Sequence, residues 1–326
     1  MNGEKELSRR KFVQLAGLFS LFPLFGSHFD LKPTLPIRQN GNRLVLLGTK
    51  GGPGIHSYIP SPAANLIVYN NIPFVIDTGY GVTFKLLEAG IKLSDLKYIF
   101  ITHHHSDHNL ELGTLLYNSW IGGLRESVDV FAPMGVKSML EHSWLSNHFD
   151  IETRINDEGR GELVDIRKLT IAHEYTEGTL LTDSEISITA LRNIHPPIKE
   201  SYALKFKLGD KTIVFSGDTT YCPALADFSF EADYLVHEVM LVPAVETFVK
   251  RRHNAPKNLK ESIIAHHTSA EDVGRIASQA KVKNLVLNHF VPSDDKTLTD
   301  KDWIDPVRTT FDGNIIVGKD LLELPL

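Results

Sequence analysis

The segment FITHHHSDHN concentrates side chains that can bind metal ions, with four histidines and one aspartate between positions 103 and 108. It follows an apolar, β-branched run that is typical of a strand. Alternate side chains of an extended segment share a face, so His103 and His105 lie together while His104 points away. A frame shifted by one residue would place Ser106, a poor ligand, in the middle. One frame therefore supplies good nitrogen and oxygen donors: His103, His105, Asp107 and His108.

Imidazole and carboxylate donors suit Zn²⁺, which they bind at about 2.0–2.2 Å, and a catalytic site draws further ligands from distant parts of the chain. A solvated run of histidines is the alternative interpretation, but it does not explain the spacing of the donors. The sequence predicts a site for divalent metal, with Zn²⁺ as the first choice. Mn²⁺ and Fe²⁺ accept the same ligand types.

Strands and helices must position these side chains. The strand KYIFIT ends at Thr102, directly before the cluster, and a Gly209-Asp210 turn joins two later strands into a hairpin. The pattern Thr268-Ser269-Ala270-Glu271 is typical of a capping box at a helix start. Hairpins and crossovers are mixed along the chain, which predicts two sheets covered by helices in one domain. The predicted helices span residues 84–89, 109–123, 134–149, 243–252 and 269–280.

The frame of four donors resembles the signature of the metallo-β-lactamase superfamily. Further motifs of that superfamily follow in its order: FVIDTGYG with Asp77, LRNIHPP with His195, VFSGDTT with Asp218 and LVLNHF with His289. The resemblance extends from Arg43 to the end of the chain. It implies an α/β fold, the αββα metallo-β-lactamase sandwich, with metal ions at one edge.

The resemblance also implies a role for each residue in a dinuclear centre. Asp218 would bridge two metal ions, and Asp77 would orient a ligand imidazole through a hydrogen bond. A water molecule activated between the two metals would attack the substrate. Asp107, as a ligand of one of these metals, is therefore also counted among the predicted catalytic residues. The first metal would be held by His103, His105 and His195, and the second by Asp107, His108 and His289.

Two further motifs, YLVHEVM and AHHTSAEDVGRIA, resemble those of ribonuclease Z and its relatives, a branch that includes arylsulfatases. The resemblance implies that Glu238 orients His267, which protonates the leaving oxygen as a general acid. The neighbouring His237 and His266 are interpreted as structural. Cys222 is the chain's one cysteine and is interpreted as a packing residue.

The branch implies hydrolysis of a small phosphodiester or sulfate ester. Transfer RNA is disfavoured as a substrate because residues 150–168 carry six acidic and four basic side chains, which repel a polyanion. The net charge of −6 likewise gives no general basic character. The alternatives that stay open are a lactone or β-lactam hydrolase, a cyclic-nucleotide phosphodiesterase and, outside enzymes, an inactive metal-binding protein.

The N-terminal sequence SRRKFVQLAGLFSLFPLFG resembles a twin-arginine export signal, with Arg9 and Arg10 before an apolar run. That run is shorter than the ~20 residues that span a bilayer. We expect a signal segment at 1–30, a linker at 31–41 and the hydrolase domain at 42–326. The expected partner is the twin-arginine export machinery and the expected location is the periplasm, with membrane tethering if the signal stays uncleaved. The sequence leaves open whether the chain is a monomer or a homodimer.

Overall fold

The computed structural model describes residues 41–55, 60–156 and 164–326, and all structural statements concern this part. The predicted signal segment and all but the last residue of the predicted linker lie outside it. Among the described helices, none is both long enough and apolar enough to cross a membrane.

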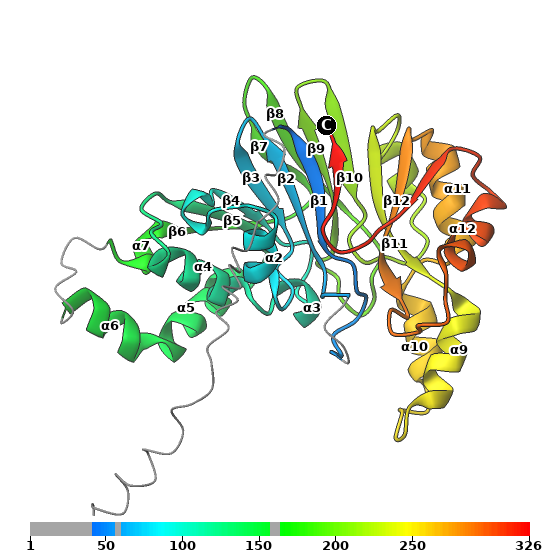
Figure 1. Cartoon of the computed structure of the whole chain (residues 1–326), viewed down its shortest axis with the longest axis horizontal. Helices are drawn as coiled ribbons and strands as arrows, with labels where there is room; N and C mark the ends of the chain where they lie inside the picture. The colour runs from blue at the N-terminus through cyan, green and yellow to red at the C-terminus, as the bar shows by residue number, and fades with distance from the viewer. Residues whose placement is uncertain (1–40, 56–59, 157–163) are drawn as a thin grey trace, which may run out of the picture. The chain divides into compact units, whose positions relative to one another are not determined.

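Two mixed sheets form the centre of the fold (Figure 1). The first is seven-stranded, in the order β14-β1-β2-β3-β4-β5-β6, and the second is seven-stranded, in the order β13-β12-β11-β10-β9-β8-β7. The first sheet consists of β1 (Arg43–Gly48), β2 (Ala64–Tyr69), β3 (Ile72–Ile76), β4 (Tyr98–Phe100), β5 (Val128–Pro133), β6 (Thr170–Tyr175) and β14 (Leu322–Pro325). The second consists of β7 (Gly178–Thr182), β8 (Ile186–Arg192), β9 (Tyr202–Leu208), β10 (Lys211–Phe215), β11 (Tyr234–Met240), β12 (Asn284–Val291) and β13 (Asn314–Val317).

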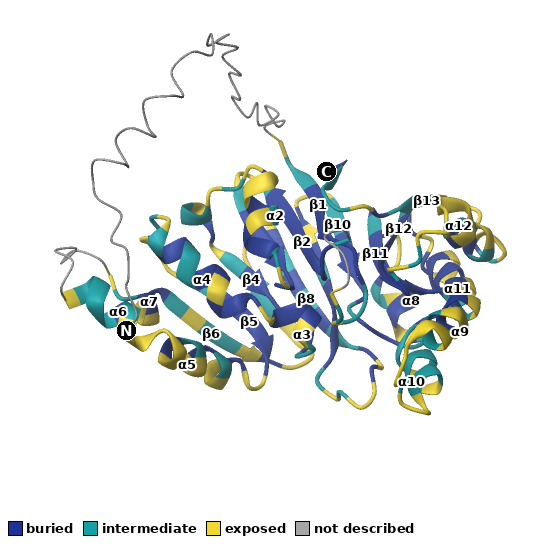
Figure 2. Cartoon of the chain, turned by 60° about the horizontal axis from the view of Figure 1, so that its bottom comes forward, coloured by how far each residue is buried: buried dark blue, intermediate teal, exposed yellow. Residues whose placement is uncertain are grey.

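Helices cover the outer face of each sheet, as the dark, buried sheet surfaces beneath them show in Figure 2. On the first sheet lie α2 (Val82–Glu88), α4 (Leu112–Ile121) and α5 (Val136–Ser146), and on the second lie α8 (Ala224–Phe228), α11 (Ala270–Ala280) and α12 (Asp300–Arg308). The remaining helical segments are η1 (Leu93–Asp95), α3 (Ser106–Asn109), α6 (His148–Asn156), α7 (Ile166–Leu169), α9 (Val242–Arg251) and α10 (Leu259–His266).

Three buried apolar clusters hold these layers together. Between the sheets, Phe206 of β9 meets Phe100 of β4 edge to face, with ring centroids 5.2 Å apart. Trp120 lies in the cluster under the helices of the first sheet, and Ile276 lies in the cluster under those of the second. Burial of this apolar surface is the main force that stacks the layers. The predicted αββα sandwich is confirmed.

The helix starting near residue 269 differs in detail from the prediction. Its N-cap is Ser269, whose Oγ accepts a hydrogen bond from the Asp272 amide at 3.2 Å. The predicted cap, Thr268, is wrong by one residue. Its hydroxyl donates instead to the Thr219 carbonyl at 2.6 Å, inside the protein. A tertiary hydrogen bond therefore takes the side chain that the local pattern assigned to the helix.

Parallel strands bring the predicted site residues to one edge. Strand β4 pairs in parallel with β3 and β5, and β11 pairs in parallel with β10 and β12. The carboxyl ends of parallel strands meet at the same edge of a sheet, where ligands of α/β proteins bind. Segments that are distant in sequence therefore converge there.

Candidate metal centre

The predicted metal ligands come from four separate segments of the chain. His103 follows β4, and His105 is the N-cap of α3, whose first turn contains Asp107 and His108. His195 follows β8, Asp218 follows β10, and His289 lies within β12. All of these side chains except that of His105 are buried; they are His103, Asp107, His108, His195, Asp218 and His289.

Two of the site residues have left-handed backbone conformations that are uncommon outside glycine. Asp77 has φ 61° and His289 has φ 44°. Such backbone costs free energy and is concentrated at functional sites. A true glycine, Gly217 at φ 59°, precedes Asp218, and a Cβ there would lie 2.6 Å from the Tyr202 carbonyl oxygen. The chain thus bends sharply where it presents these side chains.

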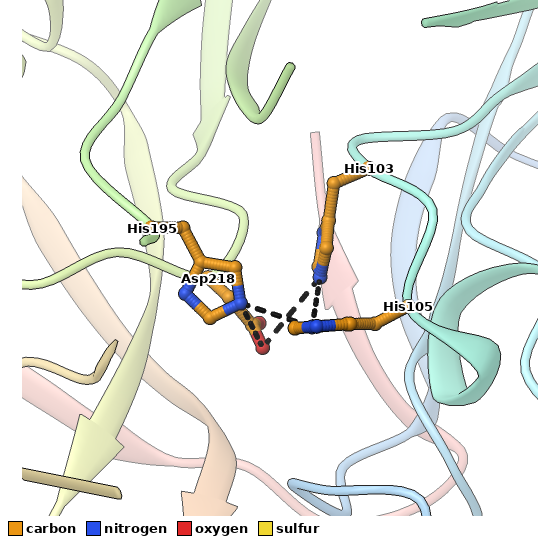
Figure 3. Close-up of side chains that lie close together, drawn as sticks. All are labelled: His103, His105, His195 and Asp218. Atoms are coloured by element: carbon orange, nitrogen blue, oxygen red, sulfur yellow. Dashed lines mark hydrogen bonds and ion pairs between the residues drawn. The ribbon is translucent and has the colours of Figure 1, made fainter. Parts of the chain in front are cut away.

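The first cluster consists of three imidazoles and one carboxylate oxygen (Figure 3). His105 Nδ1 lies 3.1 Å from His103 Nε2 and 3.0 Å from His195 Nε2. Asp218 Oδ2 lies 3.9 Å from both Nε2 atoms. Ligand atoms that each lie about 2 Å from a tetrahedral ion are separated by roughly 3.3 Å. This spacing suits one metal ion.

The second cluster lies on the other side of Asp218. His108 Nε2 and His289 Nε2 are 3.2 Å apart, and Asp107 Oδ2 is 3.4 Å from His289 Nε2. The other carboxylate oxygen of Asp218, Oδ1, is 3.2 Å from His108 Nε2 and 3.3 Å from His289 Nε2. Each oxygen of Asp218 therefore faces one cluster, as a bridging ligand would.

An unsatisfied oxygen tests whether metal ions fit here. Asp218 Oδ1 is buried and has no hydrogen-bond partner, although two imidazole nitrogens lie beside it. A buried carboxylate oxygen without a partner is costly. A cation between the oxygen and the two nitrogens would satisfy all three atoms, so the donor set fits a dinuclear metal site.

The first-cluster histidines are held neutral. Burial, reinforced by the neighbouring imidazoles, holds the pKa of His103 well below its usual value against the attraction of Asp218. Burial likewise lowers the pKa of His195 to about 4 and lowers that of His105. Metal ligands must be deprotonated. These side chains are ready to bind without first losing a proton.

The carboxylates of the centre are ionised, and a positive charge beside them would stabilise them. Burial opposes ionisation of Asp218, but His289 and His108 hold its pKa well below the usual value. Asp107 also has a lowered pKa, because His108 and His289 outweigh its burial. In turn Asp218, Asp77 and Asp107 raise the pKa of His108 despite its burial. A divalent cation bound at the centre would compensate these carboxylates.

Asp77 supports the centre from behind. Its Oδ2 accepts a hydrogen bond from His108 Nδ1 at 2.8 Å, and its Oδ1 accepts one from the Thr102 amide at 2.8 Å. The bond fixes which ring nitrogen of His108 faces the metal site. His104 points away from the cluster, with Nε2 3.0 Å from the Pro133 carbonyl oxygen.

Glu238 and His267 lie next to the two clusters. His267 Nδ1 donates to Glu238 Oε2 at 2.8 Å, and the Thr219 amide donates to Glu238 Oε1 at 2.5 Å. Burial disfavours the protonated ring, but the charge and hydrogen bond of Glu238 raise the pKa of His267 to about 9. At neutral pH the imidazole therefore carries a proton on Nε2, as a general acid requires.

His267 also belongs to a third group of potential ligands. Its ring, Asp218 and His289 offer ligand atoms within 4.8 Å of one another. Because Nδ1 is occupied by Glu238, Nε2 is the nitrogen that could either protonate a substrate or bind metal. Replacement of His267 would release metal if the residue is a ligand, but not if it is only a proton donor.

A cavity of about 340 Å³ opens onto the centre. Its floor consists of metal-ligand candidates and His267, and its sides include residues that sequence reasoning missed. Helices α9 and α10, called the cap below, contribute an apolar side with Phe248, Leu259 and Ile263. Lys50, in the sequence-distant segment that follows β1, also lines the cavity. The missed residues are Lys50, Phe248, Arg252, Leu259, Ile263 and Asp294; the Lys50-Gly51-Gly52-Pro53-Gly54 run after a strand was the one local signal.

Comparison with known proteins identifies the family. The sequence profile described as anti-Pycsar protein Apyc1 matches residues 43–290, which include every predicted metal ligand. The chain belongs to the anti-Pycsar protein Apyc1 family. One curated relative of this chain is a ribonuclease Z of Mycobacterium marinum. The two sequences are 28% identical over 285 residues, which cover 85% of this chain and 96% of the relative.

Solved structures show the same fold. The metallo-β-lactamase fold protein YhfI from Bacillus subtilis superposes with a TM-score of 0.65 at 19% identity, covering 87% of this chain and 100% of that one. Human tRNase Z, short form, gives a TM-score of 0.62 at 18% identity, covering 86% and 98%. This Apyc1-family chain is a metallo-β-lactamase-fold hydrolase related to ribonuclease Z, with histidine and aspartate clusters for metal binding.

Proposed function

We propose that the chain hydrolyses a small phosphodiester at a dinuclear metal centre. The observation that carries this proposal is the bridging position of Asp218 between two ligand clusters, beside the Glu238–His267 pair. Two bound divalent ions would lower the pKa of a water molecule and neutralise charge on the phosphoryl oxygens. Zn²⁺ is the ion that these ligands favour, and Mn²⁺ and Fe²⁺ are the alternatives.

The chain's own residues supply the other half of the reaction. An alkoxide is a poor leaving group and needs a proton as the ester bond breaks. His267 Nε2 holds such a proton, and Glu238 stabilises the protonated ring through its 2.8 Å hydrogen bond to Nδ1. The pair therefore supports a substrate whose leaving oxygen departs poorly without a proton, such as an alkyl phosphodiester.

The preference for a phosphodiester over a sulfate ester comes from the relatives. The curated proteins named ribonuclease Z act on RNA, whose linkages are phosphodiesters, and they match over 85% of this chain. The cavity of about 340 Å³ suits a small ester. Its apolar cap side would contact the alcohol part of the substrate, and its floor would contact the phosphate.

A large RNA substrate finds little support in the charges of residues 150–168. Arg154 pairs with Asp150 at 2.7 Å, and Arg167 pairs with Asp165 at 2.6 Å and with Glu152 at 2.7 Å. The two arginines thus form ion pairs with neighbouring carboxylates, which reduces the positive charge that they offer to RNA phosphates. We therefore propose a small-molecule substrate, with a cyclic-nucleotide phosphodiester within the same reaction class.

A panel of chromogenic substrates tests the proposal. The purified, metal-loaded chain should hydrolyse bis(p-nitrophenyl) phosphate with a higher kcat/KM than p-nitrophenyl sulfate, a chromogenic lactone or a chromogenic β-lactam. Faster hydrolysis of the sulfate, the lactone or the β-lactam would reassign the substrate class. Absence of turnover on all of them, with metal bound, would support an inactive metal-binding protein.

We also propose that the N-terminal segment directs export to the periplasm by the twin-arginine machinery. The support is the Arg9-Arg10 pair before a short apolar run; both lie outside the described residues. Replacement of both by lysine keeps the charge and removes the guanidinium groups. Cell fractionation should then find the protein in the cytoplasm, whereas unchanged export would show that the segment has another role.

A further inference from the structure

Lys50 is a nearly fully buried cation in the wall of the active-site cavity. The residue is 6% exposed, and it lines the same cavity as His105, Asp107 and Asp218. The residue follows β1 and has no place in the predicted dinuclear centre. Burial of an ammonium group is costly unless it is paired, so its position calls for an explanation.

The backbone around Lys50 is fixed against the strand that carries a predicted metal ligand. The Lys50 amide donates to the Ser61 carbonyl at 2.9 Å, and the Gly51 amide donates to the Phe290 carbonyl at 3.2 Å. A Cβ on Gly51 would lie 2.7 Å from that carbonyl oxygen and 3.0 Å from His289 Nδ1. Glycine is required for this close approach. Lys50 is therefore held beside the metal centre.

The ammonium group has unused hydrogen-bonding capacity. Nζ donates to the Gly51 carbonyl at 3.0 Å and to the Gly52 carbonyl, which leaves one of its three hydrogens. Within the described part of the chain, no carboxylate forms an ion pair with Nζ. Burial lowers the pKa of Lys50, against the attraction of Asp107 and Asp294. A bound anion would stabilise the charged form.

We propose that Lys50 Nζ binds a phosphoryl oxygen of the substrate and positions it over the metal centre. The inference rests on the proposed function, because it names the contact that would select an anionic ester. The two glycine carbonyls orient the ammonium group, and its third hydrogen is left for the ligand. A neutral lactone or β-lactam would gain nothing from this contact.

Lys205 provides a matched control elsewhere in the fold. Its Nζ also donates to a backbone carbonyl, that of Phe228 at 3.0 Å, and burial also lowers its pKa. It lies in β9 and does not line the active-site cavity. The two lysines thus share local chemistry and differ in access to the substrate.

The test uses inorganic phosphate as the probe on the full, metal-loaded chain. Charge-assisted hydrogen bonds are strong, so Lys50→Gln should raise the dissociation constant of phosphate about 10- to 100-fold by calorimetry. Lys50→Arg should restore part of the affinity, and Lys205→Gln should leave it unchanged. In bis(p-nitrophenyl) phosphate hydrolysis, Lys50→Gln should act mainly on KM. Unchanged phosphate affinity in Lys50→Gln, or an equal loss in Lys205→Gln, would overturn the proposal.

A wild-type measurement covers the case in which the Lys50 variants fail to fold. Crystals grown with phosphate should show a phosphate oxygen within about 3 Å of Nζ. Phosphate bound elsewhere in the cavity would overturn the inference. Phosphate binding requires no turnover, so failure of this inference is distinguishable from failure of the proposed diester hydrolysis.

Discussion

The floor and the cap of the active-site cavity are built in different ways. The floor consists of side chains that follow core strands, such as His195 and Asp218, each 2% exposed. In the cap, α10 contains no buried residue, and a small separate cluster around Met240, Val245 and Val291 connects it to the body. The metal-ligand candidates thus rest on the sandwich, whereas the apolar side of the cavity rests on a thinly attached pair of helices.

The largest expected effect concerns the floor. Asp218→Ala removes the oxygen donors that face both clusters, so kcat/KM should fall on the order of 10⁴-fold, about 5–6 kcal/mol of transition-state stabilisation. Elemental analysis should find fewer than two metal ions per chain. The exposed Asp227→Ala in α8 serves as control. Two tightly bound ions in Asp218→Ala would refute the bridging assignment.

The next prediction tests whether His267 is a general acid and not a metal ligand. His267→Ala should slow an alkyl phosphodiester about 10³-fold and a nitrophenyl diester far less, because nitrophenolate leaves without a proton. Glu238→Gln should show the same bias more weakly, since Glu238 acts only through the imidazole. The measurement is kcat/KM over esters of graded leaving-group pKa, with metal content determined for each variant.

The pH dependence of the hydrolysis rate is an independent test of the role of His267. With a pKa of about 9, the ring is protonated at neutral pH, and the rate on the alkyl diester should fall as pH rises through that value. This alkaline limb should be absent from His267→Ala. Metal loss in His267→Ala would instead make His267 a ligand of the third group, and equal slowing across the ester series would exclude it as the general acid.

A stability comparison tests how firmly each region is attached. Ile276 in α11 is fully buried, and Ile276→Ala should cost about 2–5 kcal/mol of unfolding free energy. Ile263 in α10 is half-buried, and Ile263→Ala should cost about 1 kcal/mol or less. Denaturant unfolding monitored by circular dichroism measures both. Equal losses would show that the cap is as integral to the fold as the sandwich helices.

The smallest expected effect concerns substrate contact in the cap. Phe248→Ala removes apolar surface from the cavity side, so KM should rise about 10-fold while kcat and metal content stay near wild type. This split follows if Phe248 binds substrate and transition state equally. A large fall in kcat would mean instead that the cap helps to build the catalytic geometry.

The same contrast explains what could be predicted from the sequence. The floor was predictable because its residues stand at strand ends with fixed local spacing, as in His103-x-His105-x-Asp107-His108. Of the cap, α9 was predicted as a helix at residues 243–252. Helix α10 was not predicted, because it has a weak apolar stripe and its N-cap residue, Asn258, makes no capping hydrogen bond through its side chain. Lys50 escaped notice because a lone lysine gains meaning only from its buried neighbours. The same holds for Thr268, whose hydroxyl serves Thr219 rather than the helix.

Metal counting on the wild-type chain tests the central claim most directly. Elemental analysis of the purified protein should give two divalent ions per chain, and removal of both by a chelator should abolish bis(p-nitrophenyl) phosphate hydrolysis until Zn²⁺, Mn²⁺ or Fe²⁺ is restored. Full activity in the metal-free protein, or saturation at a single ion with full activity, would contradict the dinuclear assignment.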